Sequence, residues 1–557
     1  MGRQGGNFGL YWCEWKTIGS APPEKSFRGV ANARDGCTVV PVSRPKRKFL
    51  FTASLTKDRP LSLKLPALLA TLVFVLLVCF ARRYGFHADE LYFLECAQHP
   101  TWGYVDLPPL LPWLTWIVIH TLGTSLTAVR LYPALAAAAT VLLVARLASE
   151  LGGQRRAVIT AAVLTAITPV ALAFGHILST NALDMPLWTA AVLLLVRIEK
   201  TSNPRLWLAF GTVAGVALLH KYSLAFYLAA LAVGTLLTAW RRWFLNRWFW
   251  GGAAIALAIT LPNILWQAHR HFPFVELQHN HRNVILPLLQ FVYAQALLVN
   301  ILSSAFVIAG AVFFFTPPMK RFRALGWAFI AYMLLMYSLH AKDYLVTPVY
   351  PAMLAAGAVA AERWFAKTWS RRLVAAYVIA ACALSAFMLP TVVPVLSIDA
   401  FARYYQVMVL HRTESEENAH SAVPDYYSSC FGWKERAQAV ARYYNALPAE
   451  ERQKTAIFGS FYGQAGAIDH FGPALGLPKA ICSHHSYWYW GSRGYTGESV
   501  IVLDVDLEYL QRHCASVTLV ADPKVQWARP DWERPIYHCR KFDRDLTQEW
   551  DAYRHFD

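Results

Sequence analysis

The amino-acid sequence predicts a polytopic α-helical membrane protein with a soluble α/β domain at its C-terminal end. Hydrophobic residues fill 56% of the 557 positions and charged residues only 16%, whereas soluble domains carry about 25% charged residues. Trp, Tyr and Phe together make up 14% of the chain, as expected for aromatic belts at membrane interfaces. The mean hydropathy of +0.31 therefore indicates extensive contact with lipid.

Long apolar runs predict about eleven transmembrane helices, since a span needs about 20 residues. The first run is Leu65–Ala81. No small-residue cleavage site follows it, so we expect a helix that stays in the membrane rather than a signal peptide. The run Leu110–Leu122 is short, and we expect a re-entrant or interfacial segment. The remaining runs lie near 128–148, 157–175, 184–198, 206–220, 222–240, 249–267, 287–315, 324–340, 345–361 and 373–390.

Basic residues in alternate loops predict the orientation of these helices. Every second loop is rich in Lys and Arg, which places those loops in the cytoplasm and the other loops outside. The net charge of +17 follows from this bias, so it does not indicate a nucleic-acid partner. The basic loops contain, among others, Arg155, Arg197, Arg241, Lys320 and Arg371.

Three regions follow from this pattern. We expect residues 1–62 to form a disordered, basic cytoplasmic tail and residues 63–392 to form a multi-pass domain in the inner cell membrane. Residues 393–557 should form a periplasmic or extracellular α/β domain, because strand-like and helix-like patterns occur there. These patterns are the predicted strands Thr455–Phe458, Val500–Leu503 and Ser516–Val520 and the predicted helix Trp433–Asn445.

Four cysteines lie in this last region: Cys430, Cys482, Cys514 and Cys539. An oxidising compartment outside the cytoplasm favours disulfides. We therefore predict that at least two of the four pair, and the alternative is four free buried thiols.

Acidic residues collect in the predicted outer loops. Asp89 and Glu90 follow the first span by a few residues, and Asp184 lies in the second outer loop. A carboxylate at this depth suits a general base acting on an acceptor hydroxyl or amine. The alternative is a solvated loop acid. Asp106 precedes two prolines, so it is a candidate metal or substrate ligand or, alternatively, an ordinary turn-initiating Asp.

Histidines and cations accompany these acids. His279 and His281, paired with a carboxylate from another loop, would suit a divalent cation, and we expect their loop to approach Asp106. The alternative is a chance spacing in an interfacial loop. Three outer cations are candidates for phosphate binding, with snorkelling of lysines to the interface as the alternative. These cations are Lys221, Arg282 and Lys342.

The outer-loop motifs resemble a known family. Asp89-Glu-Leu-Tyr-Phe, Gly103-Tyr-Val-Asp-Leu-Pro-Pro and Lys342-Asp-Tyr-Leu-Val-Thr-Pro are similar in order and sidedness to membrane GT-C glycosyltransferases. The most similar branch is the protein O-mannosyltransferase and lipid A aminoarabinose transferase superfamily. The resemblance covers roughly residues 65–360 and implies a GT-C fold.

This resemblance implies sugar transfer from a polyprenyl-phosphate donor to a lipid, glycan or protein acceptor outside the cytoplasm. The family's catalytic acid falls on Asp89 and its second-loop acid on Asp184. Lys221, Arg282, Lys342 and Tyr344 would bind the substrate phosphate.

In the aminoarabinose branch, a bound metal lies near positions that match Asp106 and His279 or His281. Here Asp106 replaces a Glu and Leu107 replaces a Lys or His, which weakens the metal prediction. A transporter or lipid flippase is the main alternative function, but such proteins place ionisable groups within their spans, and this sequence has few there. A membrane-anchored assembly protein is a further alternative.

Overall fold

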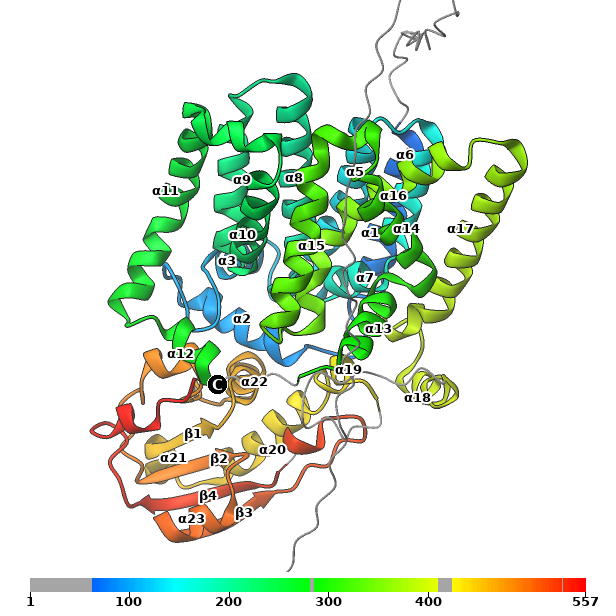
Figure 1. Ribbon diagram of the computed structural model, residues 1–557. Coiled ribbons are helices and arrows are strands. Elements are labelled where there is room, and N and C mark those ends of the chain that lie inside the picture. Colours follow the sequence, from blue (N-terminus) through cyan, green and yellow to red (C-terminus); the bar gives the residue numbers. More distant parts are fainter. Residues whose placement is uncertain (1–62, 281–284, 409–422, 533, 557) are drawn as a thin grey trace, which may run out of the picture. The chain divides into compact units, whose positions relative to one another are not determined.

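The computed structural model describes residues 63–280, 285–408, 423–532 and 534–556 (Figure 1). The described residues belong to one compact unit. The predicted cytoplasmic tail, residues 1–62, lies outside the described residues.

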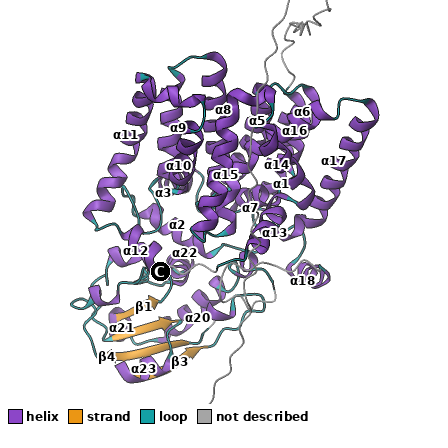
Figure 2. Ribbon diagram, in the orientation of Figure 1, coloured by secondary structure: helices purple, strands orange, loops and turns teal. Residues whose placement is uncertain are grey.

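Up to residue 408, the described secondary-structure elements are all helices, which are joined by loops (Figure 2). The predicted apolar runs correspond to helices or to pairs of helices in this part. The helices are α1 Lys64–Phe80, α2 Ala88–Gln98, α3 Leu110–Thr121, α4 Leu126–Val129, α5 Leu131–Glu150, α6 Arg155–Ala166, α7 Pro169–His176, α8 Asp184–Thr201, α9 Leu206–His220, α10 Ser223–Leu236, α11 Arg247–His269, α12 Pro273–Asn280, α13 Leu288–Val299, α14 Ile301–Phe313, α15 Arg323–Ser338, α16 Tyr350–Trp364, α17 Thr368–Met388 and α18 Ile398–Val407.

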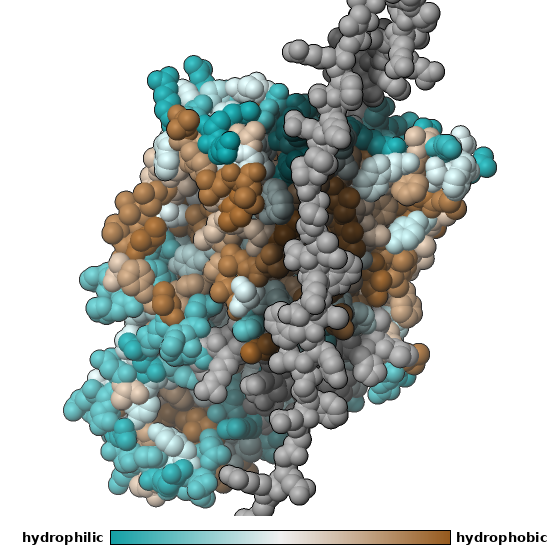
Figure 3. Space-filling model, in the orientation of Figure 1, coloured by the Kyte–Doolittle hydropathy of each residue, from teal (hydrophilic) through white to brown (hydrophobic). Residues whose placement is uncertain are grey.

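Apolar side chains form a broad band over the helical part, between more hydrophilic surfaces (Figure 3). Within the described residues, four helices are long and apolar enough to cross a membrane, and up to seven spans result if each bent pair counts as one. Shorter apolar helices add to these, namely α1, α3 and α9. The chain thus has the helices of a multi-pass membrane protein, and the count of about eleven spans stays a prediction.

Three predicted spans contain a sharp bend in the structure, among them the run 222–240, where α10 meets the 3-10 helix Ala239–Leu245 at 109°. The run 157–175 becomes α6 and α7, which meet at 55° where Thr168 precedes Pro169 and takes an extended conformation, as residues before proline do. The run 287–315 becomes α13 and α14, which meet at 103°. Asn300 makes this corner with a φ of 81° and caps α14 by accepting a hydrogen bond from the backbone N–H of Leu302.

The C-terminal region contains a four-stranded sheet in the order β1-β2-β4-β3. β1 and β2 are parallel, and the other neighbours are antiparallel. The predicted strands and the predicted helix are confirmed, but β4 was not predicted because His, Arg and Lys interrupt its apolar alternation. The elements are α19 Asp425–Ser428, α20 Trp433–Ala446, α21 Ala449–Lys454, β1 Thr455–Gly459, α22 Tyr462–Phe471, β2 Ser499–Leu503, α23 Leu507–His513, β3 Cys514–Ala521 and β4 Ile536–Phe542.

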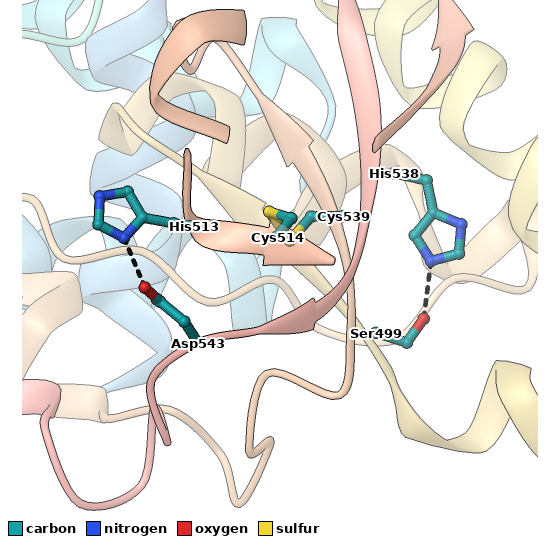
Figure 4. Close-up of a disulfide and its surroundings, with 6 residues drawn as sticks. All are labelled: Ser499, His513, Cys514, His538, Cys539 and Asp543. Atoms are coloured by element: carbon teal, nitrogen blue, oxygen red, sulfur yellow. Dashed lines mark hydrogen bonds and ion pairs between the residues drawn. A yellow bond between two sulfur atoms is a disulfide. The ribbon is translucent and has the colours of Figure 1, made fainter. Parts of the chain in front are cut away.

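A disulfide joins β3 to β4, as Figure 4 shows. Its partners are Cys514 and Cys539, which confirms the prediction that at least two of the four cysteines pair. Cys430 and Cys482 are buried free thiols.

Candidate active site in the first outer loop

The first turn of α2 presents the predicted catalytic acid. His87 is the N-cap, and its Nδ1 accepts a hydrogen bond from the backbone N–H of Asp89 while Glu90 accepts one from the backbone N–H of His87. Negative side chains are favoured in the first turn of a helix because the free N–H groups there carry partial positive charge. The Asp89 side chain remains 37% exposed, so it is accessible to a substrate.

Asp89 has a partner from the C-terminal region. The hydroxyl of Tyr462 donates a hydrogen bond to Asp89 Oδ1 at 2.7 Å. The other carboxylate oxygen, Oδ2, lies 3.7 Å from Nδ1 of His87. One oxygen is therefore fixed by a phenol, while the side chain as a whole keeps an exposed edge.

Glu90 has a different environment from its neighbour. Its side chain is fully buried, and its two oxygens accept four hydrogen bonds, from Arg130 Nε and NH2 and from the backbone N–H groups of His87 and Leu178. Burial alone would raise the pKa of Glu90, but the Arg130 guanidinium lowers it below its usual value. Glu90 thus links the first and second predicted outer loops, and both of its oxygens accept hydrogen bonds within the protein. This environment suits a structural role, and the catalytic assignment of Glu90 stays a prediction.

Asp106 lies in the loop between α2 and α3 and also has a phenol partner. The Tyr92 hydroxyl donates a hydrogen bond to Asp106 Oδ1 at 2.7 Å. Burial raises the pKa of Asp106 to about 7, and the charge of Asp89 contributes in the same direction. The Tyr92 ring centre lies 4.6 Å from that of Tyr462, which donates to Asp89, so the phenol partners of the two acids are neighbours.

Lys221, one of the residues predicted to bind phosphate, lies between α9 and α10. Its ammonium group donates a hydrogen bond to Asn181 Oδ1 and lies 5.6 Å from the centre of the Tyr344 ring. Burial lowers the pKa of Lys221 to about 8, the charge of Asp184 opposes this change, and Lys342 adds to it. The Lys221 ammonium group thus lies beside the ring of Tyr344, which follows Lys342 by two positions in the chain. Phosphate binding by these residues stays a prediction.

Asp184 is a buried acid near this basic group. Its side chain is 2% exposed. Oδ1 lies 3.3 Å from His220 Nδ1, and Oδ2 accepts a hydrogen bond from Ser223 at 3.3 Å. Asp184 is thus placed to hold α8, α9 and α10 together, while direct contact with a substrate would require it to be uncovered.

Hydrogen bonds connect the segments that carry the acidic groups to those that carry the basic groups. Glu90 accepts a hydrogen bond from Leu178, which lies in the loop that also supplies Asn181 to Lys221. A second connection runs through Gln267 of α11, whose amide donates to the Tyr104 carbonyl and to the Tyr222 hydroxyl. These contacts connect the Asp89 loop to the Lys221 loop.

Part of the predicted site lies outside the described residues, namely His281 and Arg282. His279 is exposed on α12. α12 packs beside the Asp106 loop, because Leu277 and Val105 share one hydrophobic cluster. Among the residues that the structure describes, no three His, Cys, Asp or Glu side chains are arranged to hold a metal ion. The metal prediction therefore stays untested.

Sequence reasoning missed the contribution of the C-terminal region to this site. Tyr462 lies 373 positions from Asp89, and no local pattern around Tyr462 indicates its partner. Ser486 contacts the same loops, since its backbone N–H donates to Tyr92 and its hydroxyl accepts from the backbone N–H of Val105.

Comparisons with known proteins agree with this architecture. Residues 106–266 match the family model of dolichyl-phosphate-mannose-protein mannosyltransferase. The lipopolysaccharide core galacturonosyltransferase RgtB of Rhizobium johnstonii is 30% identical over 186 residues, which cover 32% of this chain and 37% of that protein. Both similarities thus cover only part of this chain, and the second covers only part of RgtB as well.

The crystal structure of ArnT from Cupriavidus metallidurans bound to undecaprenyl phosphate matches a much larger part of the chain. The TM-score is 0.58 at 15% identity, over 85% of this chain and 97% of that one. The apo form of the same protein matches with a TM-score of 0.55 at 16% identity, over the same shares of both chains. The predicted resemblance to GT-C membrane glycosyltransferases is therefore confirmed at the level of the fold.

Proposed function

We propose that this protein is a membrane glycosyltransferase. It transfers a sugar from a polyprenyl-phosphate-linked donor to a lipid, glycan or protein acceptor at the outer face of the inner cell membrane. The matched relatives support this class of reaction, since one is a galacturonosyltransferase and the other binds undecaprenyl phosphate. The partly exposed carboxylate of Asp89, connected through hydrogen bonds to the loop that contacts the partly buried Lys221, is the observation that carries the proposal.

Asp89 acts as the general base in this reaction. It takes the proton from the acceptor hydroxyl or amine as the acceptor atom bonds to the anomeric carbon of the sugar. The bond from that carbon to the phosphate oxygen breaks, and its electron pair stays on the polyprenyl phosphate. In-line attack inverts the anomeric centre, because no second carboxylate is required as a nucleophile.

The cations stabilise the leaving group. Lys221 and Lys342 neutralise the negative charge that develops on the phosphate, and Tyr344 lines their site. Arg282 is proposed to bind the same phosphate, because it lies in a predicted outer loop. The described residues of the Asp106 and His279 loops do not by themselves form a complete ligand set for a metal ion.

Replacement of Asp89 by Asn tests the general-base role. Asn keeps the size of the side chain and can accept the Tyr462 hydrogen bond, but it cannot take a proton. Cells that lack the protein should accumulate a polyprenyl-linked sugar, and mass spectrometry of their lipid extract would detect it. Wild-type protein should remove this lipid, whereas Asp89→Asn should slow its turnover by about 10²–10⁴-fold.

A matched control is Asp399→Asn, which changes an exposed acid in the first turn of α18. It should restore wild-type turnover at an equal amount of protein in the membrane. Normal turnover by Asp89→Asn would contradict the proposal. Transfer by the purified protein in detergent, where no second compartment exists, would exclude the transporter alternative.

A further inference from the structure

The C-terminal region packs against α2, the helix that carries the proposed general base. A Cβ atom added at Gly463 of α22 would lie 3.1 Å from the Cβ of Ala88, and one at Gly466 would lie 3.0 Å from the backbone of Leu91. These contacts leave no room for side chains between the two helices. α22 therefore packs directly on the first two turns of α2.

An ion pair extends this contact along the helix. The Lys479 ammonium donates to both carboxylate oxygens of Glu95, at 2.8 and 2.7 Å. Ala88, Leu91 and Glu95 follow each other at helical spacing, so they share one face of α2. Because the Glu95 side chain is 5% exposed, the C-terminal region meets α2 in a largely buried contact.

Tyr462 lies at the start of α22, and its ring contacts two other aromatic rings. Its ring centre is 4.6 Å from that of Tyr92 and 5.1 Å from that of His484, which stacks on it at an interplanar angle of 6°. The two neighbouring phenols each donate to one of the acids, since Tyr462 donates to Asp89 and Tyr92 donates to Asp106. The orientation of the Tyr462 hydroxyl is thus set before any substrate binds.

We infer that Tyr462 is a positioning residue for Asp89, so that the C-terminal region completes the active site instead of merely following it in the chain. This inference rests on the proposed function. A carboxylate with one oxygen fixed by a phenol keeps its other oxygen in a defined direction, toward the acceptor proton. Correct orientation of a catalytic group lowers the activation barrier, because less motion is lost in the transition state.

Tyr462→Phe tests the inference, because it removes the hydroxyl and keeps the stacked ring. The assay uses the full-length protein in detergent with the polyprenyl-linked sugar that accumulates in cells lacking the protein. We expect kcat to fall about tenfold, the effect of losing one hydrogen bond to a charged group, while KM for this donor stays within about twofold. The control Tyr487→Phe removes a phenol–carboxylate hydrogen bond to Asp469 in the same region, and it should leave kcat unchanged.

A double variant separates positioning from a structural role. In the Asp89→Asn background, Tyr462→Phe should cause no further loss of transfer, because there is no base left to orient. An equal additional loss would overturn the inference, as would wild-type kcat in Tyr462→Phe alone. If Asp89→Asn itself keeps normal transfer, the general base of the proposed function fails first. If Asp89→Asn is inactive and Tyr462→Phe is normal, only the positioning role fails.

Discussion

Glu90 and Asp89 are adjacent acids, and the structure predicts opposite consequences when each is replaced by its amide. In Glu90→Gln, one of the two oxygens becomes an NH2 group. Each Glu90 oxygen accepts one hydrogen bond from Arg130 and one from a backbone N–H, so the new NH2 group faces two donors in either orientation. The buried Arg130 guanidinium also loses its counter-charge.

The size of this effect follows from burial. Removing the charge of one partner in a buried ion pair costs about 3–5 kcal/mol, because the other charge stays buried without a partner. This is a large share of the roughly 5–15 kcal/mol that stabilises a typical folded protein. We expect Glu90→Gln to lower the unfolding midpoint of the purified protein in detergent, and to reduce activity only in proportion to the folded fraction. Asp89→Asn should change the unfolding free energy by less than about 1 kcal/mol, because the side chain is partly exposed.

Activity per folded molecule decides between the two acids. If Glu90→Gln unfolds at the wild-type midpoint yet is inactive while Asp89→Asn is active, the general base is Glu90 and the reasoning fails. Combining Glu90→Gln with Arg130→Met provides a second check. The double variant should lose less stability than the sum of the single variants, since neither charge is then left buried alone.

Two further predictions concern the C-terminal region. Burial and the charge of Arg540 lower the pKa of His538 to about 4 from 6.5, against the opposing charge of Glu451, so the folded state disfavours protonation and stability should fall as pH drops from 6.5 toward 4. The loss reaches about 3 kcal/mol, and unfolding midpoints at pH 7 and 4.5 should show it in the wild type but less in His538→Gln. Orientation is tested with reporters fused after about residue 400. A reporter that works only outside the cytoplasm should be active there. Strong activity of a cytoplasm-only reporter there would overturn the predicted sidedness.

The sequence predicted the helical part of the fold well, because the apolar runs are long and lipid contact leaves few alternatives to a helix. It failed where a run changes direction inside the membrane part. The corner at Asn300 depends on a side chain that caps α14 and donates to the Ala381 carbonyl of α17, and a hydropathy pattern does not contain such a contact. β4 was missed for a related reason, since His538 and Cys539 are buried by pairing with β2 rather than by apolar alternation.

The site shows the same division. Asp89, Asp184 and Lys221 were found because ionisable groups are unexpected beside apolar runs. The different environments of Asp89 and Glu90 were not predictable, because two adjacent acids are equivalent in the sequence and only the fold pairs Glu90 with Arg130. Tyr462 needed the folded chain, since only the packing of α22 on α2 brings it to Asp89.

The last prediction concerns the helix pair that supports the Asp106 loop. α11 holds this loop through Asn263, which donates to the Trp102 carbonyl, and through Gln267. Further along α11, a Cβ atom added at Gly252 would lie 2.2 Å from the Trp207 carbonyl oxygen of α9, whereas one at Gly251 would lie 3.1 Å from a movable Leu208 methyl group. Small residues permit this close approach of membrane helices.

Gly252→Ala should therefore separate α9 from α11 and lower the unfolding free energy in detergent by about 1–3 kcal/mol, the usual cost of overpacking. Gly251→Ala is the matched control. It should be neutral or stabilising by up to about 1 kcal/mol, because alanine favours a helix more than glycine does. Equal stability of the two variants would show that the backbones of α9 and α11 do not approach as closely as the structure indicates. A destabilised Gly252→Ala with reduced transfer per folded molecule would in addition show that the spacing of α9 and α11 is transmitted to the Asp106 loop.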